Sequence, residues 1–457
     1  MPDTEEDVSA LTATLAGYIA AALGRALPAA VAEKTKHHLL DTLAAMLSGS
    51  RLKPGRLAAA YVERLGGWPA ATVVGTGTVT STVNAALANG MMAHADETDD
   101  SHLRGRFHPG CGIVPAALAV AEATAGSGAA LLKAVALGYD VGARATMALG
   151  YSRADTARHS THSLGPAFGA VAAAGALLRL DARQVRHSLA FAVQQASGVP
   201  FWQRDEEHIE KAFDFGGMGA RNGVAAATMV AAGFTAVEDP FAGRHNLFTA
   251  FAETARPELL ADGLGERFEI RNASIKKWCV GSPIQAALDS LTALMAAYGL
   301  RAPDVRRVVA HMPDDRLHIV DNRRMPDVCL QHLLALTLVD GGLTFASSHD
   351  YARMSDPAVL EMRRRIEAVP SAELTQAVPA RQAIIEIETA AGERFVHRTR
   401  AVRGTPDNPM ERADIAAKAL DLIAPVTGAE RAAELIETIW ALEHLDSVQT
   451  LRPLLQA

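Results

Sequence analysis

Residues 84–122, NAALANGMMAHADETDDSHLRGRFHPGCGIVPAALAVAE, place a polar loop between two alanine-rich segments of helical period. Four carboxylates and three histidines lie within the fifteen residues from His94 to His108. Buried helices on both sides would hold such a loop, and loops on rigid scaffolds often carry function. The stretch therefore predicts a helical fold organised around this loop. The plainer alternative is a helix cap followed by a solvated turn.

The composition favours a mainly α-helical protein. The 457 residues are rich in Ala and Leu and poor in aromatic side chains, and this length allows two or three units with ample core. The net charge of -7 gives no basic surface for nucleic acid. No apolar run reaches membrane-spanning length, and the acidic N-terminus lacks the features of a signal peptide. Three widely spaced cysteines, Cys111, Cys279 and Cys329, are typical of reduced thiols in a cytoplasmic protein.

Polar segments alternate with alanine-rich helices along the first part of the chain. We expect a helix from Thr4 to about Leu23, a second one beginning at Pro28, and a helix capped by Ser81 that leads into the loop. Two further polar segments, residues 158–169 and 206–223, each precede another alanine-rich helix. The pattern of a polar segment followed by a helix therefore recurs three times.

The pattern changes near residue 268. Alternating apolar and polar residues predict four strands, at residues 267–272 (RFEIRN), 305–312, 383–389 and 395–402, the last two joined by a hairpin loop. Helical stretches are predicted at residues 283–298, 327–338 and 356–367, and again from Met410 onward. We therefore expect an all-helical domain of residues 1–267 and 405–457, and a smaller α+β lid domain of residues 268–404.

Histidines in the polar segments are candidates for moving a carbon-bound proton. Proton abstraction next to a carboxylate needs a base whose pKa lies near neutrality, and histidine provides one without large tuning. The candidates are His108, His159 and His162.

Cationic groups near these histidines could stabilise the negative charge that forms on the substrate. Lys211, Arg104 and Arg106 could supply charge, and the glycines of residues 216–219 could expose backbone N–H groups. The helix that follows each polar segment adds a positive dipole end, which suits a carboxylate. These features make a small anionic substrate plausible.

Other kinds of site stay open at this point. A metal site is the sharpest alternative, since imidazole and carboxylate bind zinc, iron or manganese, although no HExxH motif occurs. Its candidate ligands are His94, Asp96, Asp99, Asp100, His102 and His108. A metal-dependent hydrolase of this kind would lose activity with a chelator, whereas a binding protein without turnover would tolerate His159→Ala in binding assays. No GxSxG motif supports a serine hydrolase.

Short motifs follow one another in a characteristic order along nearly the whole chain. They are Asn89-Gly90, Ala93-His94-Ala95, Asp99-Asp100-Ser101, His108-Pro109, Gly138-Tyr139-Asp140-Val141, Arg144, His159-Ser160-Thr161, Gly169-Ala170, Lys211 before Gly216, and the run from Gly404 to Met410. By these motifs the chain resembles the MmgE/PrpD family, which includes 2-methylcitrate dehydratase, cis-aconitate decarboxylase and iminodisuccinate epimerase. The resemblance implies a large helical domain with a smaller α+β lid, a homodimer, and lyase or isomerase chemistry on di- or tricarboxylates without a metal or other cofactor.

The resemblance also implies roles for individual residues. The catalytic set would be His108, His159, Lys211, Glu97, Ser101 and Asp100. His159 or His108 would move the proton, with His162 a competitor for the role given to His159. Glu97 or Asp100 would orient a histidine. The groups that hold substrate carboxylates would be Arg104, Arg106, His162, Gln285 and Lys276.

Dehydration of the 2-methylcitrate dehydratase type is the expected reaction. Epimerisation of the iminodisuccinate epimerase type is an alternative, for which His108 and Lys211 could supply the two proton donors. Decarboxylation of the cis-aconitate type is another, and Gln285 stands near the position where decarboxylase-like members have a histidine.

Overall fold

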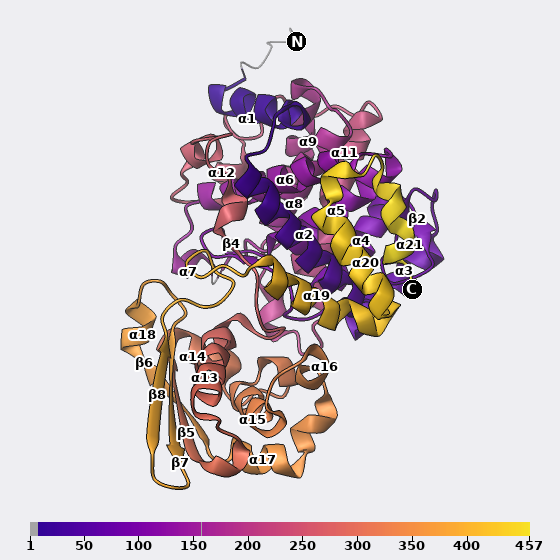
Figure 1. Ribbon diagram of the computed structural model, residues 1–457. Helices are drawn as coiled ribbons and strands as arrows, with labels where there is room; N and C mark the ends of the chain where they lie inside the picture. Colours follow the sequence, from indigo (N-terminus) through magenta and orange to yellow (C-terminus); the bar gives the residue numbers. More distant parts are fainter. Residues whose placement is uncertain (1–7, 157) are drawn as a thin grey trace. The chain divides into compact units, whose positions relative to one another are not determined.

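Two compact units make up the chain in the computed structural model, which describes residues 8–156 and 158–457. Unit 1 comprises Met1–Ala273 and Ile415–Ala457, and unit 2 comprises Ser274–Asp414. Unit 1 is built from helices, whereas unit 2 carries a four-stranded sheet (Figure 1). The predicted fold class, a large helical part with a smaller α+β part, is therefore confirmed.

Helices account for nearly all regular structure in unit 1. The longer ones are α1 (Ala10–Ala20), α2 (Ala29–Gly49), α3 (Lys53–Leu65), α4 (Thr82–Ala93), α5 (Pro109–Ala123), α6 (Gly128–Ala148), α8 (Leu164–Leu177), α9 (Ala182–Gln194), α11 (Met218–Ala231) and α20 (Ala429–Trp440). Shorter pieces are α7 (Arg153–Thr156), α10 (Ile209–Ala212), α12 (Leu247–Phe251), α21 (Arg452–Leu455), and the strands β1 (Ala71–Thr72), β2 (Val79–Thr80) and β3 (Ser101–His102). The two boundaries between the units fall within β4 (Ala273–Ser274) and near the start of α19 (Arg412–Thr427).

Serine caps set the beginnings of several of these helices. Ser81 accepts a hydrogen bond from the backbone N–H of Asn84, as predicted for the helix that leads into the loop. Ser9 does the same at the start of α1, so the first described helix begins after the predicted Thr4, which lies outside the described residues.

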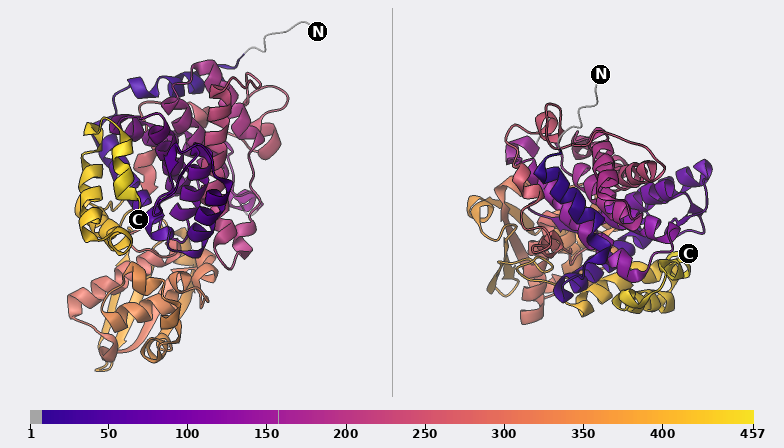
Figure 2. Two further views of the ribbon diagram at one scale, coloured as in Figure 1. Left: turned by 90° about the vertical axis from the view of Figure 1, so that its right-hand side faces the viewer. Right: turned by 90° about the horizontal axis from the view of Figure 1, so that it is seen from above.

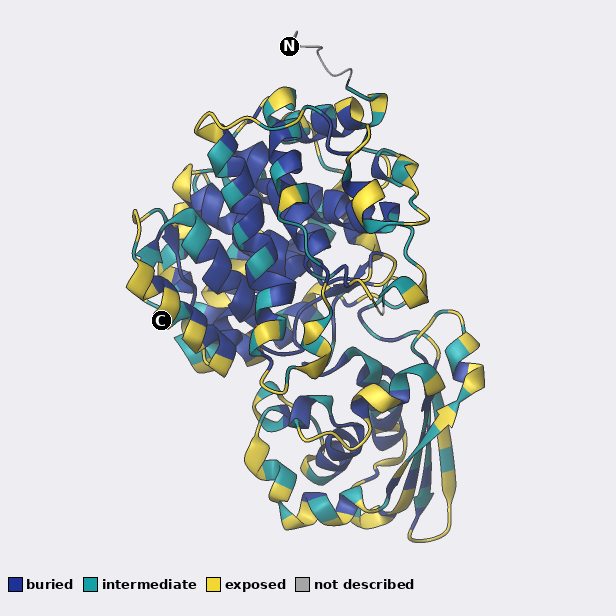
Figure 3. Cartoon of the chain, turned by 180° about the vertical axis from the view of Figure 1, so that it is seen from behind, coloured by how far each residue is buried: buried dark blue, intermediate teal, exposed yellow. Residues whose placement is uncertain are grey.

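Small residues let the central helices of unit 1 pack closely. Helix α8 contacts α5, α6 and α11, and all of its residues are buried. A Cβ atom on Gly138 of α6 would lie 2.9 Å from the carbonyl oxygen of Gly169 of α8, so the backbones meet there without side chains between them. Figure 3 shows the resulting buried interior. The alanine and glycine content of the sequence thus becomes a dense helical core.

The C-terminal segment returns to unit 1, where α20 packs against α2 (Figure 2). Lys36 Nζ donates to the carbonyl oxygen of Trp440 at 2.7 Å. Lys418 Nζ lies 2.6 Å from Asp41 Oδ1 and 3.0 Å from the carbonyl oxygen of Thr98, and these contacts are buried. The last helices therefore support both α2 and the polar loop.

The sheet of unit 2 has the strand order β6-β5-β7-β8. Its strands are β5 (Val305–Pro313), β6 (Ile366–Ser371), β7 (Ala383–Thr389) and β8 (Arg394–Thr399). Only the β5–β6 pair is parallel. Along β7 every second residue is buried, which fits a sheet with one face against a core.

Helices cover the buried face of this sheet. They are α13 (Gln285–Tyr298), α14 (Asp314–Val320), α15 (Leu330–Asp340), α16 (Phe345–Ser348), α17 (Pro357–Arg363) and α18 (Ala372–Gln376). Helix α13 packs on β7 and β8, and α15 packs against α13 and α17. Leu288, Leu333 and Ile385 are among the fully buried members of this core.

Two local predictions are wrong. Residues 267–272 do not form a strand, because Glu269–Asn272 makes a 3₁₀ turn in which the Glu269 N–H donates to Asp140 Oδ1 of α6. The predicted helix at 356–367 ends at Arg363, and Ile366 already pairs with Val308 in the sheet. Among the described residues, no helix has both the length and the apolar character needed to cross a membrane.

Candidate active site

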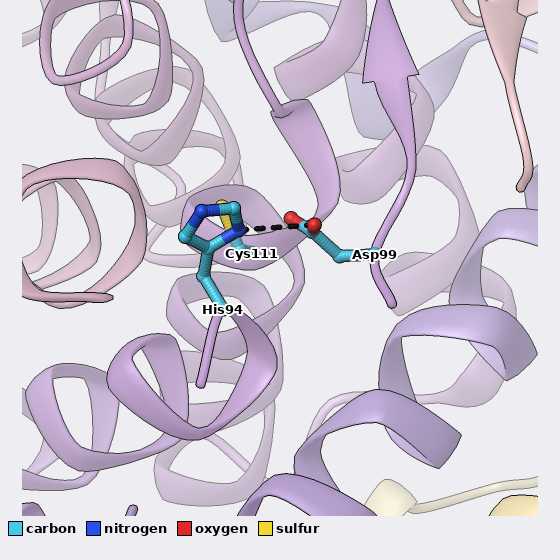
Figure 4. A group of neighbouring side chains, drawn as sticks. All are labelled: His94, Asp99 and Cys111. Atoms are coloured by element: carbon cyan, nitrogen blue, oxygen red, sulfur yellow. Dashed lines mark hydrogen bonds and ion pairs between the residues drawn. The ribbon is translucent and has the colours of Figure 1, made fainter. Parts of the chain in front are cut away.

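The polar loop between α4 and α5 brings two histidines onto one carboxylate. His94 Nδ1 lies 2.9 Å and His108 Nδ1 3.0 Å from the same oxygen, Oδ1 of Asp99. Figure 4 shows the Asp99 contact to His94. Burial alone would raise the pKa of Asp99, but the adjacent His108 and His94 hold it well below its usual value. Asp99 is therefore ionised, and it can accept the Nδ1–H of both rings.

The neighbouring carboxylate, Asp100, anchors the loop instead. His38 Nδ1 and the Tyr139 hydroxyl each lie 2.6 Å from Asp100 Oδ2, and the Gly110 N–H donates to Asp100 Oδ1 at 2.9 Å. These contacts tie the loop to α2, α6 and the start of α5. Burial lowers the pKa of His38 to about 4, so this ring is neutral. Glu97 or Asp100 was expected to orient a candidate base; Asp100 contacts His38, and Asp99 contacts His108.

A single aromatic ring, Phe215, brings the three polar segments together. It lies in a π-helical turn, η3 (Phe213–Gly217), between α10 and α11. Turns of this kind occur frequently at functional sites. The distances from its ring centroid are 3.9 Å to His162, 4.4 Å to His94, 5.2 Å to Trp202, 5.3 Å to Lys211 Nζ and 5.4 Å to His108. We call Phe215 and these five neighbours the Phe215 cluster.

Two glycines bring α4 and η3 into contact next to the cluster. A Cβ atom on Gly216 would lie 2.0 Å from the carbonyl oxygen of Gly90, which leaves no space for any side chain. The glycines of residues 216–219 were expected to expose backbone N–H groups to a substrate. Gly216 instead packs against Gly90, and Gly219 packs against Pro166. These glycines let η3 and α11 approach α4 and α8 closely.

Lys211 and Glu97 form an ion pair at the edge of the Phe215 cluster. The side chains are only 16% and 10% exposed, so the pair is largely removed from water. Lys211 Nζ also lies 5.6 Å from the ring centroid of Trp202, within reach of a cation–π interaction. The ammonium group of Lys211 is thus held beside the histidines of the Phe215 cluster.

Two histidines around this cation are neutral. Burial lowers the pKa of His162 well below its usual value, and the charges of His108 and Lys211 lower it further. Burial and then Lys211 do the same to the pKa of His208, whose ring lies 5.2 Å from that of His94. A neutral imidazole can donate a hydrogen bond to developing negative charge without first losing a proton.

The structure separates the two histidines of the second polar segment. His162 contacts the Phe215 cluster, and its ring centroid lies 5.6 Å from that of His108. His159 is exposed, and its ring lies 6.1 Å from Tyr151. The sequence did not decide which of His159 and His162 lies beside His108. In the structure it is His162.

Other predicted site residues of unit 1 lie outside the Phe215 cluster. Arg104 and Arg106 are exposed, and Arg106 donates to the carbonyl oxygen of Ser152 at 2.6 Å. Ser101 is buried in β3. His102 accepts from the Gly105 N–H and contacts Glu269 at 3.2 Å, so both of its ring nitrogens have structural partners.

Gln285 and Lys276 belong to unit 2. The Gln285 amide accepts from the Trp278 N–H and donates to the carbonyl oxygens of Trp278 and Val280 at 2.7 and 3.0 Å. This side chain stabilises the turn before α13. Lys276 is also buried within this part of the chain.

Several members of the site were not in the predicted catalytic set. Asp99 and His94 appeared only among candidate metal ligands, and Phe215, Trp202 and His208 were not singled out. The signal for Phe215 was weak, because an aromatic residue before a glycine pair is usually core. His208 lies in the charged run from Glu206 to Lys211, a pattern typical of a solvated surface.

Two overlapping groups of side chains have the donor types that bind a metal ion. They are His94, Asp99 and Cys111 (Figure 4), and His94, Glu97 and His208. In the first group, Nδ1 of His94 already contacts Asp99. Burial also raises the pKa of Cys111 well above its usual value, so this thiol stays protonated.

Family comparison agrees with the fold. The model described as the MmgE/PrpD N-terminal domain matches residues 13–260, and the one described as the MmgE/PrpD C-terminal domain matches residues 278–444. The chain belongs to the MmgE/PrpD family. Its relatives include a cis-aconitate decarboxylase of Aspergillus terreus, 24% identical over 94% of this chain and 92% of that protein. The cis-aconitate decarboxylase-like protein oryM of Aspergillus oryzae is 29% identical, but the match covers only 59% of each chain.

Proposed function

We propose that this protein is a lyase that removes a carbon-bound proton from a small di- or tricarboxylate without a cofactor, and that the reaction is a dehydration. The main support for this proposal is the contact between Asp99 and His108. An ionised carboxylate beside Nδ1 favours the His108 tautomer in which Nε2 accepts the proton, and it stabilises the imidazolium that results.

Helix termini beside the two histidines favour an anionic substrate. His108 is the N-cap residue of α5, and His162 directly precedes Ser163, the N-cap residue of α8. The positive ends of two long helix dipoles therefore lie next to the proposed base and its neighbour, where a substrate carboxylate would be stabilised.

Dehydration also needs a group that protonates the departing hydroxide. We assign this role to Lys211, whose ammonium group Glu97 holds beside Phe215. His108 takes the proton from carbon, the carbon–oxygen bond breaks, and the hydroxide leaves as water with a proton from Lys211. Neutral His162 donates a hydrogen bond to the enolate oxygen as negative charge develops there.

Decarboxylation is the second candidate, because one relative is a cis-aconitate decarboxylase and the other a cis-aconitate decarboxylase-like protein. It requires an acid that protonates the carbanion left when carbon dioxide departs. Gln285 does not supply one, since an amide releases no proton at neutral pH and this amide is bonded to backbone groups. Lys211 would then have to be that acid, and the substrate panel below distinguishes decarboxylation from dehydration.

Proton NMR in D2O tests the proposal directly. The purified protein is incubated with citrate, 2-methylcitrate, cis-aconitate, itaconate, malate, aspartate-derived imines and their homologues. New signals of an alkene without loss of carbon dioxide support dehydration; they are a vinyl proton, or for 2-methylcitrate a methyl singlet on the double bond. Deuterium incorporation at one carbon with an unchanged skeleton points to epimerisation. Absence of exchange and of product with every acid contradicts the proposal.

Matched histidine variants identify the base. His108→Gln should abolish the reaction, and His162→Gln should slow it. His159→Gln is the control, because this ring is exposed and contacts Tyr151. If His159→Gln is inactive while His108→Gln retains full activity, the base has been assigned to the wrong histidine.

We further propose a cytoplasmic homodimer. The three cysteines are buried and form no disulfide, as expected for a reducing compartment. Helix α3 exposes Leu57, Tyr61 and Leu65 at helical spacing, and Trp68 beyond it is 82% exposed. An apolar stripe of this kind is suited to self-association. Light scattering of wild-type protein and of the Tyr61→Lys variant tests the proposal, since a monomeric wild type contradicts it.

A further inference from the structure

His208 has two features that cost free energy: its backbone conformation and a buried ring nitrogen. It has φ +59°, a left-handed backbone conformation that non-glycine residues rarely adopt. It is only 6% exposed, and its Nε2 atom has no hydrogen-bond partner within the described residues. A buried imidazole nitrogen without a partner costs free energy. A ligand that bound this nitrogen would compensate part of the cost.

His94 presents a second nitrogen of the same kind. The ring is fully buried, and its Nε2 also has no partner among the described residues. Asp99 Oδ1 lies 2.9 Å from Nδ1 of His94, so Nε2 is the ring nitrogen that a ligand would contact. Figure 4 shows this nitrogen on the side of the ring away from Asp99.

The same two histidines lie next to a buried carboxylate. One ligand atom from each of His94, Glu97 and His208 lies within 4.8 Å of the others, and all three residues are buried. Two imidazole nitrogens and one carboxylate form a common donor set for zinc, iron(II) and manganese. The contact from Asp99 to His94 corresponds to the outer carboxylate that orients most metal-bound histidines.

We propose that His94, Glu97 and His208 form a binding site for a divalent transition-metal ion such as Zn²⁺, and that this ion competes with the Lys211 ammonium group for Glu97. Metal binding does not depend on the proposed reaction. The functional consequence, inhibition by loss of the Glu97–Lys211 pair, does rest on it.

The three ligand atoms must move only slightly closer together to bind one ion. Bonds of about 2.1 Å to a tetrahedral zinc ion place two ligand atoms about 3.4 Å apart. Side-chain rotations, mainly of Glu97, would bring the three atoms from separations of at most 4.8 Å to this distance. The ion would replace one positive charge by two, beside a carboxylate that already pairs with a cation.

Metal binding can be measured on the full chain without any substrate. Chelator-treated protein is dialysed against Zn²⁺ at micromolar concentration, and bound metal is counted by mass spectrometry. Co²⁺ titration, followed by its visible absorption, reports coordination by nitrogen and oxygen. We expect one ion per chain in the wild type. Because even outer partners of metal ligands change affinity by about 10- to 100-fold, His208→Gln should weaken binding at least about tenfold.

Two further variants make the test specific. His159→Gln, at an exposed histidine, should bind the ion as the wild type does. Lys211→Met removes the competing ammonium group, so binding should become tighter. Glu97→Gln replaces His208→Gln if the latter does not fold, as judged by circular dichroism.

Three results overturn the proposal. They are the absence of stoichiometric binding by wild-type protein, equal affinity in the wild type and in the ligand variant, and unchanged or weaker binding in Lys211→Met. None of these readouts uses catalysis, so failure of the metal site is distinguishable from failure of the proposed dehydration.

Discussion

Replacement of Asp99 by asparagine is the sharpest test of the proposed base. The amide side chain of Asp99→Asn would keep the size of the carboxylate but remove the negative charge 3.0 Å from His108 Nδ1. At an effective dielectric constant of about 20, a full charge pair at this separation is worth about 5 kcal/mol. If about half of the positive charge has developed on His108 in the transition state, the barrier rises by about 2.5 kcal/mol. That corresponds to about a 50- to 100-fold lower kcat.

The matched control is His94→Gln, because His94 uses the same oxygen of Asp99 and a glutamine amide can still donate to it. This variant leaves the contact between Asp99 and His108 intact, so its kcat should stay within about threefold of the wild type. Both variants are assayed by product formation on the substrate that the NMR panel identifies, after thermal unfolding has shown that they are folded. A kcat of Asp99→Asn within about threefold of the wild type would refute the carboxylate–histidine reasoning.

Three other predictions concern stability and packing. Burial lowers the pKa of His332 to about 4, so between about pH 6.5 and pH 4 the unfolded chain takes up a proton that the folded chain does not. Stability should therefore fall by up to about 3 kcal/mol over this interval, and His332→Phe should flatten the dependence of Tm on pH; an unchanged dependence contradicts it. Lys418→Met leaves Asp41 buried without its cation and should destabilise the protein by about 3–5 kcal/mol in urea unfolding, a loss that adding Asp41→Asn should partly restore. Phe215→Leu should lower kcat by disordering Lys211, whereas Phe213→Leu in the same π-helical turn should not; equal effects would mean that Phe215 has only a packing role.

Helical periodicity was sufficient to predict much of the fold, because it reflects local chemistry. The cap at Ser81 and the alternation along β7 both follow from interactions within a few residues. The errors arose where a distant partner decides the structure. Ile366 becomes a strand residue because it pairs with Val308, and Glu269 lies in a turn that bonds to Asp140. Neither partner can be identified from the local pattern.

The candidate site was predictable as a set of segments but less so as a set of atoms. Asp99 and Asp100 are adjacent, and spacing alone could not show that one contacts His108 while the other contacts His38. His159 and His162 are three residues apart in an irregular segment, where no helical or strand period fixes the direction of a side chain. The catalytic roles of these residues stay predictions until variants are assayed.

The contact between Asp41 and Lys418 bears on how the protein is made. A ribosome completes Asp41 377 residues before its partner, so α2 must wait for the last helices before its buried acid is neutralised. Until then the nascent bundle contains a desolvated carboxylate and an apolar face of α2 that α20 has not covered. Chains that stop prematurely in the last tenth of the sequence should therefore depend on chaperones or be degraded, even though every residue of the Phe215 cluster has already been synthesised.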